Sequence, residues 1–162
     1  MLDFKGMYEA QKAFRNRIDY KGSDRFEKLI LALQVELGEC ANELPESFKF
    51  WAHKENNLET ALVEYVDGLS FILDLGIEIA FDDFEMIYVF TSGDEKRNIE
   101  SQFINLFSLV LNFKKYKNEF TFIELISEFM VLGGLIGFSL EQIEEAYYQK
   151  NAVNHSRQNE GY

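Results

Sequence analysis

The sequence predicts an all-α protein. Pro45 is the single proline in 162 residues, and the alternating runs of Val or Thr that would indicate strands are almost missing. Apolar residues recur instead with the 3.6-residue period of an α-helix. A chain of this length can bury a substantial core, so we expect one domain over residues 1–162, folded as a bundle of about six or seven helices.

Two helices are expected before Pro45. The first should span residues 3–19 and the second 24–44, where the proline ends it because the proline ring cannot continue a helix. One face of the first helix gathers apolar side chains and a single amide: Phe4, Met7, Gln11, Phe14 and Ile18.

The third helix should open at a capping box formed by Asn56 and Glu59 and continue to Phe81. The later helices are expected over residues 83–91, 96–115, 121–134 and 139–155. Capping boxes are predicted to open the last two: Thr121 with Glu124, and Ser139 with Gln142.

Three glycines, Gly38, Gly68 and Gly76, interrupt otherwise good helices. Each costs about 1 kcal/mol relative to alanine at such a position. We therefore interpret them as places where the second and third helices approach a neighbour closely.

The charge balance limits the partners. The chain has 16 basic and 28 acidic residues, and its net charge of −12 opposes binding to a nucleic-acid backbone or an anionic membrane. The two most apolar stretches, 62–81 and 120–138, both contain acidic residues and are expected to be buried helices rather than membrane spans. We expect neither nucleic acid nor a membrane as a partner.

Composition also bears on location and assembly. Cys40 is the single cysteine, which fits a reducing cytoplasm, and we expect it to be a small buried apolar residue. Aromatic residues make up 15% of the chain, which implies a large core and an apolar surface left for a partner subunit.

Two pairs of acidic residues lie in apolar helical stretches. Glu36 and Glu39 share one helix face, as do Glu64 and Asp67, and Glu43 extends the first pair by a turn. No lysine or arginine stands three or four residues from either pair, so another cation must neutralise them. Hard carboxylate oxygens on two helices suit Mg²⁺, with Mn²⁺ as a substitute.

A solvated acidic face is the alternative explanation, and for an isolated pair it would be preferred. Here apolar residues fall on the same side of the helical wheel as Glu36: Leu29, Ala32, Leu33 and Cys40. The second pair lies in an even more apolar segment, which favours a metal site.

Gln11 is a polar residue on an apolar face, and a buried amide must find hydrogen-bond partners. A core amide satisfied by backbone is the ordinary explanation. The amide also offers one donor and one acceptor to a pyrimidine edge, but it can flip, so it cannot separate uracil from cytosine unless neighbouring groups lock it.

Two other segments could contact a nucleotide. Aromatic residues accompany Lys49 after Pro45, and although core packing is the ordinary explanation, a nucleoside site would also use an aromatic wall: Phe48, Phe50 and Trp51. Near the C-terminus, polar residues at i, i+4, i+7 and i+8 present donors suited to phosphate, where a frayed terminus is the alternative: Lys150, Asn154, Arg157 and Gln158.

Together these segments resemble the dimeric all-α deoxyuridine triphosphatases, within the all-α nucleoside triphosphate pyrophosphatases that include MazG-type enzymes. The hallmark of that superfamily is ExxE followed by ExxD, here ELGE at 36–39 and EYVD at 64–67. The narrower match rests on four blocks that together cover 63 of the 162 residues: MYEAQKAF, LALQVELGECANELPESFKFW, EYVDGLSFILDLGIE and EEAYYQKNAVNHSRQNEGY.

The resemblance implies Mg²⁺-dependent hydrolysis of dUTP to dUMP and pyrophosphate by a homodimer, with dUDP also accepted. It implies that the metal ligands and catalytic carboxylates are Glu36, Glu39, Glu64 and Asp67. Glu36 would act on the attacking water, and Glu43 would only support the ligands.

The resemblance also implies a set of substrate-binding residues: Gln11, Lys49, Trp51, Phe71, Lys150, Asn154, Arg157 and Tyr162. Gln11, Trp51 and Phe71 would serve the nucleoside, and the last four belong to a tail that contacts the phosphates. Ser70 departs from the pattern, since many relatives have histidine there, and this bears on nucleoside recognition.

Two alternatives fit parts of the sequence. One is a pyrophosphatase of the same superfamily that acts on dCTP or a modified nucleotide. The other is a non-catalytic helical protein that binds a partner through its aromatic surface.

Overall fold

The computed structural model describes residues 2–87 and 97–161, and in these residues the chain is helical, with no strand. The all-α prediction is therefore confirmed. The helices in chain order are α1 (Phe4–Arg15), α2 (Arg25–Asn42), the 3-10 helix η1 (Pro45–Ser47), α3 (Leu58–Glu78), the 3-10 helix η2 (Phe84–Met86), α4 (Ile99–Tyr116), α5 (Glu119–Ile136) and α6 (Leu140–Asn159).

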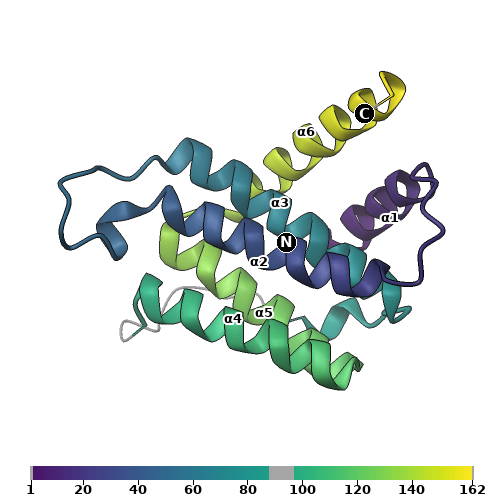
Figure 1. The fold of residues 1–162 in the computed structure, drawn as a ribbon, viewed down its shortest axis with the longest axis horizontal. Helices are drawn as coiled ribbons and strands as arrows, with labels where there is room; N and C mark the ends of the chain where they lie inside the picture. The colour runs from purple at the N-terminus through teal and green to yellow at the C-terminus, as the bar shows by residue number, and fades with distance from the viewer. Residues whose placement is uncertain (1, 88–96, 162) are drawn as a thin grey trace.

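Helix α3 is the centre of the bundle (Figure 1). It packs along α2 and also contacts α1, α5 and α6, while α4 pairs with α5 and also touches α2. Its sequence is apolar around most of its circumference, and Leu69, Ile72 and Leu73 are fully buried. A helix that is apolar on nearly all sides is stable only inside a protein, which explains why the others surround α3.

Most helix boundaries agree with the prediction, but two N-termini differ. Asn57, not a box of Asn56 and Glu59, caps α3, because its side chain accepts a hydrogen bond from the Thr60 N–H. Asn118 caps α5 in the same way by accepting from the Thr121 N–H, so the box expected to start at Thr121 is wrong. In both cases an asparagine side chain already satisfies the free amide three residues on.

The capping box at Ser139 and Gln142 is confirmed at the start of α6. Asn56 has a different role, since its side chain and backbone exchange hydrogen bonds with Glu46 across the connection between α2 and α3. Helix α1 ends at Arg15, earlier than expected, because the chain turns there toward α2.

The helix expected over 83–91 is wrong in its described part. Residues 84–86 form the 3-10 helix η2, and the described chain then continues extended at Ile87. Residues 88–91 lie outside the described residues.

The three helix-interrupting glycines have different surroundings. A Cβ built on Gly76 would lie 2.7 Å from Phe122 of α5, and one on Gly68 would lie 3.3 Å from Phe129. A Cβ on Gly38 would meet nothing within 4 Å. Close packing therefore explains Gly68 and Gly76, and the interpretation of Gly38 was wrong because that face of α2 is open.

No single helix among the described residues is both long and apolar enough to cross a membrane; α5 and α6 meet that criterion jointly, but with a bend of 110° between them.

Alanine at two of these glycines should have opposite effects on stability. Gly76→Ala forces a methyl group against Phe122, which is fully buried, so we expect the free energy of unfolding to fall by about 1–3 kcal/mol. Gly38→Ala adds helix propensity without a clash and should raise it by about 0.5–1 kcal/mol. Urea unfolding of both variants measures the difference, and equal effects would contradict the packing described here.

Candidate active site

Three carboxylates from two helices meet on one side of α3. Glu36 comes from α2, and Glu64 and Asp67 come from successive turns of α3. One oxygen from each lies within 4.8 Å of the others, and all three side chains are half-buried. Gly68 makes this convergence possible, because even a Cβ placed on it would lie 3.7 Å from the Cβ of Glu36, so the two helices approach closely here.

Glu39 is not part of this carboxylate trio. It is exposed one turn further along α2, although its negative charge contributes to raising the pKa of both Glu36 and Glu64. The structure thus gathers three of the four predicted ligands and leaves the fourth at the rim, since α2 turns Glu39 toward solvent.

The trio lacks sufficient positive charge. Burial raises the pKa of Glu36 from 4.5 to about 7, with further increases from Asp67, Glu39 and Glu64. Burial and Asp67 likewise raise the pKa of Glu64. Lys150 of α6 supplies one cation, with its Nζ 2.5 Å from Asp67 Oδ2.

One oxygen of the trio is also unsatisfied. Glu36 Oε2 is buried and has no hydrogen-bond partner among the described residues. A buried carboxylate oxygen without a partner is unfavourable. Hard oxygen donors with excess negative charge are what a divalent cation requires, so the trio fits a metal ion.

A cavity of about 500 Å³ opens beside the trio, among α1, α2, α3 and α6. Glu36 and Asp67 lie at its edge. The cations that line it are Arg15, Arg25, Lys28, Lys150 and Arg157. Apolar side chains line the rest: Phe14, Ile18, Leu29, Ala32 and Phe71. In a protein with a net charge of −12, five cations around one cavity indicate an anionic ligand.

The predicted donors of the C-terminal segment lie on this cavity. Helix α6 continues to Asn159, so Lys150, Asn154, Arg157 and Gln158 have the helical spacing predicted for them and line the cavity together. Arg17 helps to hold this part of α6 against α1, because its guanidinium lies 2.7 Å from His155 Nδ1.

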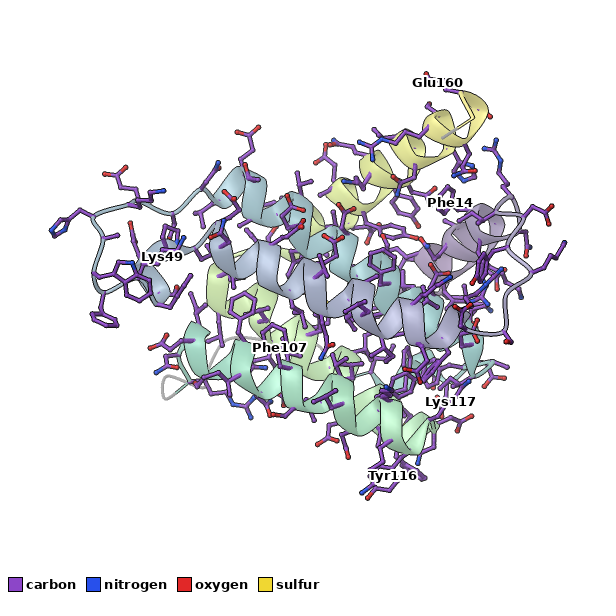
Figure 2. All side chains as sticks on the ribbon, in the orientation of Figure 1. Phe14, Lys49, Phe107, Tyr116, Lys117 and Glu160 are labelled. Carbon is purple, nitrogen blue, oxygen red and sulfur yellow. The ribbon has the colours of Figure 1, made fainter. Side chains whose placement is uncertain are left out.

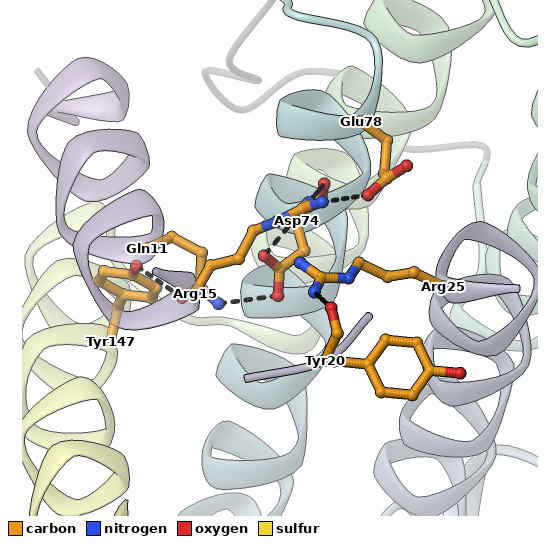
Figure 3. A network of polar contacts seen from close by, with 7 residues as sticks. All are labelled: Gln11, Arg15, Tyr20, Arg25, Asp74, Glu78 and Tyr147. Atoms are coloured by element: carbon orange, nitrogen blue, oxygen red, sulfur yellow. Dashed lines mark hydrogen bonds and ion pairs between the residues drawn. The ribbon is translucent and has the colours of Figure 1, made fainter. Parts of the chain in front are cut away.

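Gln11 lies in a buried polar network beside the cavity (Figure 3). Its Nε2 donates to Asp74 Oδ2 at 2.9 Å, and the Tyr147 hydroxyl lies 3.0 Å from its Oε1. Arg15 pairs with Glu78 and donates to the Asp74 backbone carbonyl at 3.1 Å. The amide is therefore satisfied by side chains from two other helices, not by backbone.

Phe71 and Ser70 line the cavity between Gln11 and the trio. Phe71 is half-buried and presents an apolar wall to the cavity. Ser70, which stands where many relatives have histidine, donates its hydroxyl to the Val66 carbonyl of its own helix at 2.9 Å. This hydroxyl proton is therefore directed at the backbone.

Three predicted substrate-binding residues are not placed at the cavity. Lys49 lies at the opposite end of the molecule from Phe14, a cavity residue (Figure 2), and it donates to Asn42 at 2.8 Å. Trp51, in the same connection, is 66% exposed. The connection projects beyond the ends of α2 and α3, which separates it from this cavity within one chain. Tyr162 lies outside the described residues.

Sequence reasoning missed several residues that line the cavity or the polar network beside it, although the spacing of two of them marks them. Asp74 stands seven residues after Asp67 and therefore shares its face of α3. Arg15 stands four residues after Gln11 on α1 by the same reasoning. Tyr147 stands three residues before Lys150 on α6. It is fully buried, and a buried tyrosine hydroxyl needs a hydrogen-bond partner.

The fold and the site define an all-α protein in which a carboxylate trio that could hold a metal ion adjoins a cavity lined by cations. Such a combination is typical of enzymes that act on polyphosphates. A family model described as dUTPase matches residues 3–162, whereas a search of curated proteins returns no match. The chain belongs to the dUTPase family.

Membership of this family makes the protein an enzyme that hydrolyses dUTP, a dUTP diphosphatase. It also favours dUTP over the alternative substrates considered above. The non-catalytic alternative is not supported.

Replacing Glu36 should stabilise the metal-free protein at alkaline pH. Folding raises the pKa of Glu36 from 4.5 to about 7. Between these two pH values the native carboxyl keeps a proton that the unfolded chain has lost. The free energy of unfolding therefore falls as the pH rises from 4.5 to 7. Glu36→Gln removes this loss, and we expect a gain of about 1 kcal/mol at pH 8 after allowing for solvent screening.

Thermal unfolding in a chelator at pH 8 and pH 4.5 measures this effect. The gain should vanish at the lower pH, and Mg²⁺ should stabilise the wild type more than the variant. Glu85→Gln, an exposed charge change in η2, is the matched control. A Glu36→Gln protein less stable than wild type at pH 8 would contradict the proposed repulsion.

Proposed function

We propose that the protein uses Mg²⁺ in this cavity to hydrolyse dUTP to dUMP and pyrophosphate, and that it also accepts dUDP. This reaction limits uracil in DNA and supplies dUMP. The observation that carries the proposal is that Glu36 and Asp67 of the carboxylate trio, five cations and the Gln11 amide all border one cavity.

The distances along α3 suit a deoxynucleotide. Asp67 of the trio and Asp74 of the Gln11 network are seven residues apart on one face, a rise of about 10 Å. This length lets a base lie near Gln11 while its phosphates reach the trio. Phe71, between the two on the same helix, can pack against the nucleoside.

Glu36, Glu64 and Asp67 would hold the metal ion, and Glu39 could join them from the rim. When bound, Mg²⁺ would neutralise phosphate charge and lower the pKa of a coordinated water. Lys150 already lies against Asp67, so it is well placed to contact a phosphate oxygen beside the trio.

Glu36 is the best candidate to orient the attacking water. Its Oε2 has no partner in the described structure and can accept the proton of that water. Water oxygen then bonds to phosphorus, the bridging P–O bond breaks, and pyrophosphate leaves. Asn154 and Arg157 line the same cavity and would stabilise the charge that develops on the leaving group.

A nucleotide panel tests this assignment. With Mg²⁺ and a pyrophosphate assay, dUTP should have the highest kcat/KM among the deoxynucleoside triphosphates, and Glu64→Gln should lower its kcat by at least about 100-fold with the helical fold intact. Glu59→Gln, on the first turn of the same helix, is the matched control and should retain activity. A better substrate than dUTP would reject uracil specificity, and an active Glu64→Gln enzyme would reject the metal site.

We also propose that the protein is a homodimer and that Trp51 and Lys49 serve the cavity of the second copy. Large apolar side chains are exposed in their connection, with Phe50 94% and Trp51 66% accessible. Exposed aromatic clusters of this kind favour a protein partner. Because the connection does not reach the cavity of its own chain, a substrate contact by Trp51 requires another chain.

Sedimentation and kinetics test this arrangement together. The wild type should sediment as a dimer, and Trp51→Ala should raise the KM for dUTP by about tenfold, as expected for loss of an aromatic contact. Phe120→Ala, at an aromatic residue of α5 that is even more exposed than Trp51, is the control and should leave KM unchanged. A monomeric wild type, or an unchanged KM in Trp51→Ala, would contradict the proposal.

A cytoplasmic location remains a prediction. It is supported by Cys40, a free and buried thiol whose pKa is raised to about 12 by burial.

A further inference from the structure

The amide of Gln11 is held at both ends. Asp74 accepts from its Nε2, and Tyr147 approaches its Oε1, so Gln11 lies between residues of α3 and α6 (Figure 3). Gln11 is only 3% exposed. These contacts use one N–H and one lone pair, which leaves a second N–H and a second lone pair for a ligand.

Asp74, rather than Tyr147, determines which way the amide faces. The Tyr147 hydroxyl also lies 2.9 Å from the Met7 carbonyl, so it can donate there and accept from an amide N–H, or donate to the amide oxygen. It therefore tolerates both orientations. An ionised carboxylate only accepts hydrogen bonds, so a flipped amide would place Oε1 against the oxygens of Asp74.

The surroundings of Asp74 keep its carboxylate in this role. The Arg15 guanidinium lies 3.9 Å from Asp74 Oδ1, and Arg25 adds a second positive charge from α2. Burial raises the pKa of Asp74 to about 6, while Gln11 and the two arginines oppose that increase. Asp74 Oδ1 has no hydrogen-bond partner in the part of the chain described, so core packing alone does not explain this carboxylate.

We propose that Asp74 is a positioning residue that selects uracil over cytosine by locking the Gln11 amide in one orientation. The proposal rests on the proposed function, in which Gln11 meets the base. Uracil presents a carbonyl acceptor next to its N3–H donor, and a locked amide pairs with both. Cytosine presents an amino donor next to an N3 acceptor, which is the reverse order and requires the flipped amide.

Asp74→Asn tests the lock. The new amide can either donate or accept, so it permits both orientations of Gln11. We expect the ratio of kcat/KM for dUTP to that for dCTP to fall about tenfold. The main change should be a lower KM for dCTP, because the Gln11 amide can then flip and pair with cytosine.

Glu78→Gln is the matched control. It removes a carboxylate from the next turn of α3 and breaks the ion pair with Arg15. The Gln11 amide bonds to Asp74 and Tyr147 and not to Glu78, so the variant should keep the wild-type ratio. Melting curves of both variants show whether a change in ratio merely accompanies lost stability.

The pH dependence of the ratio is a second test that needs no variant. The charged or titratable groups around Asp74 are Arg15, Arg25, Glu78 and Tyr147. Protonated Asp74 can donate to the amide oxygen and so permit the flip. The wild-type ratio should therefore fall as the pH drops from 8 to below 6, and the ratio in Asp74→Asn should not vary. Both substrates use the same carboxylate trio, so its titration cancels in the ratio.

The outcomes separate the two proposals. A wild type that does not prefer dUTP to dCTP would overturn the proposed function. A selective wild type whose ratio is unaffected by Asp74→Asn, or is constant between pH 8 and pH 5.5, would overturn the lock alone.

Discussion

The close approach of α2 and α3 at Gly68 is the constraint on which the site depends. It brings Glu36 toward Glu64 and Asp67 without local counter-charges, and it buries one carboxylate oxygen that has no partner in the described residues. Repulsion between the three carboxylates at a partly desolvated site is unfavourable for folding, so the packing of the rest of the bundle must hold them together. The buried apolar length of α3, covered by four other helices, provides that support.

Helix α3 also orders the site along its length. The trio lies at Asp67, an apolar wall at Phe71 and the amide network at Asp74, all on neighbouring turns of one rigid element. A rigid helix fixes the separation between the trio and the amide network more accurately than a loop could. Helices α1 and α6 then complete the cavity: α1 adds Gln11, and α6 adds Lys150, Asn154, Arg157 and Gln158.

Much of this could be read from local spacing. The pairs at three-residue intervals identified Glu36, Glu64 and Asp67, and the i, i+4 and i+7 pattern identified Lys150, Asn154 and Arg157, since helical periodicity alone decides which residues share a face. Glu39 shows the limit of that reasoning: it shares a helix face with Glu36, yet the crossing of α2 over α3 leaves it exposed. The capping residues Asn57 and Asn118 show another limit, since an asparagine one residue after the first predicted cap and three residues before the second provides an equivalent cap.

The sequence by itself determined the all-α class, the carboxylate pairs and the donor face of α6, because these depend on periodicity and on missing counter-charges nearby in the chain. The tertiary structure decided which of these groups meet. It set the partners of Gln11, since Asp74 and Tyr147 are distant in sequence, and it placed Lys49 and Trp51 away from the cavity of their own chain. Such contacts arise from how helices cross and pack, and no local pattern encodes the crossing.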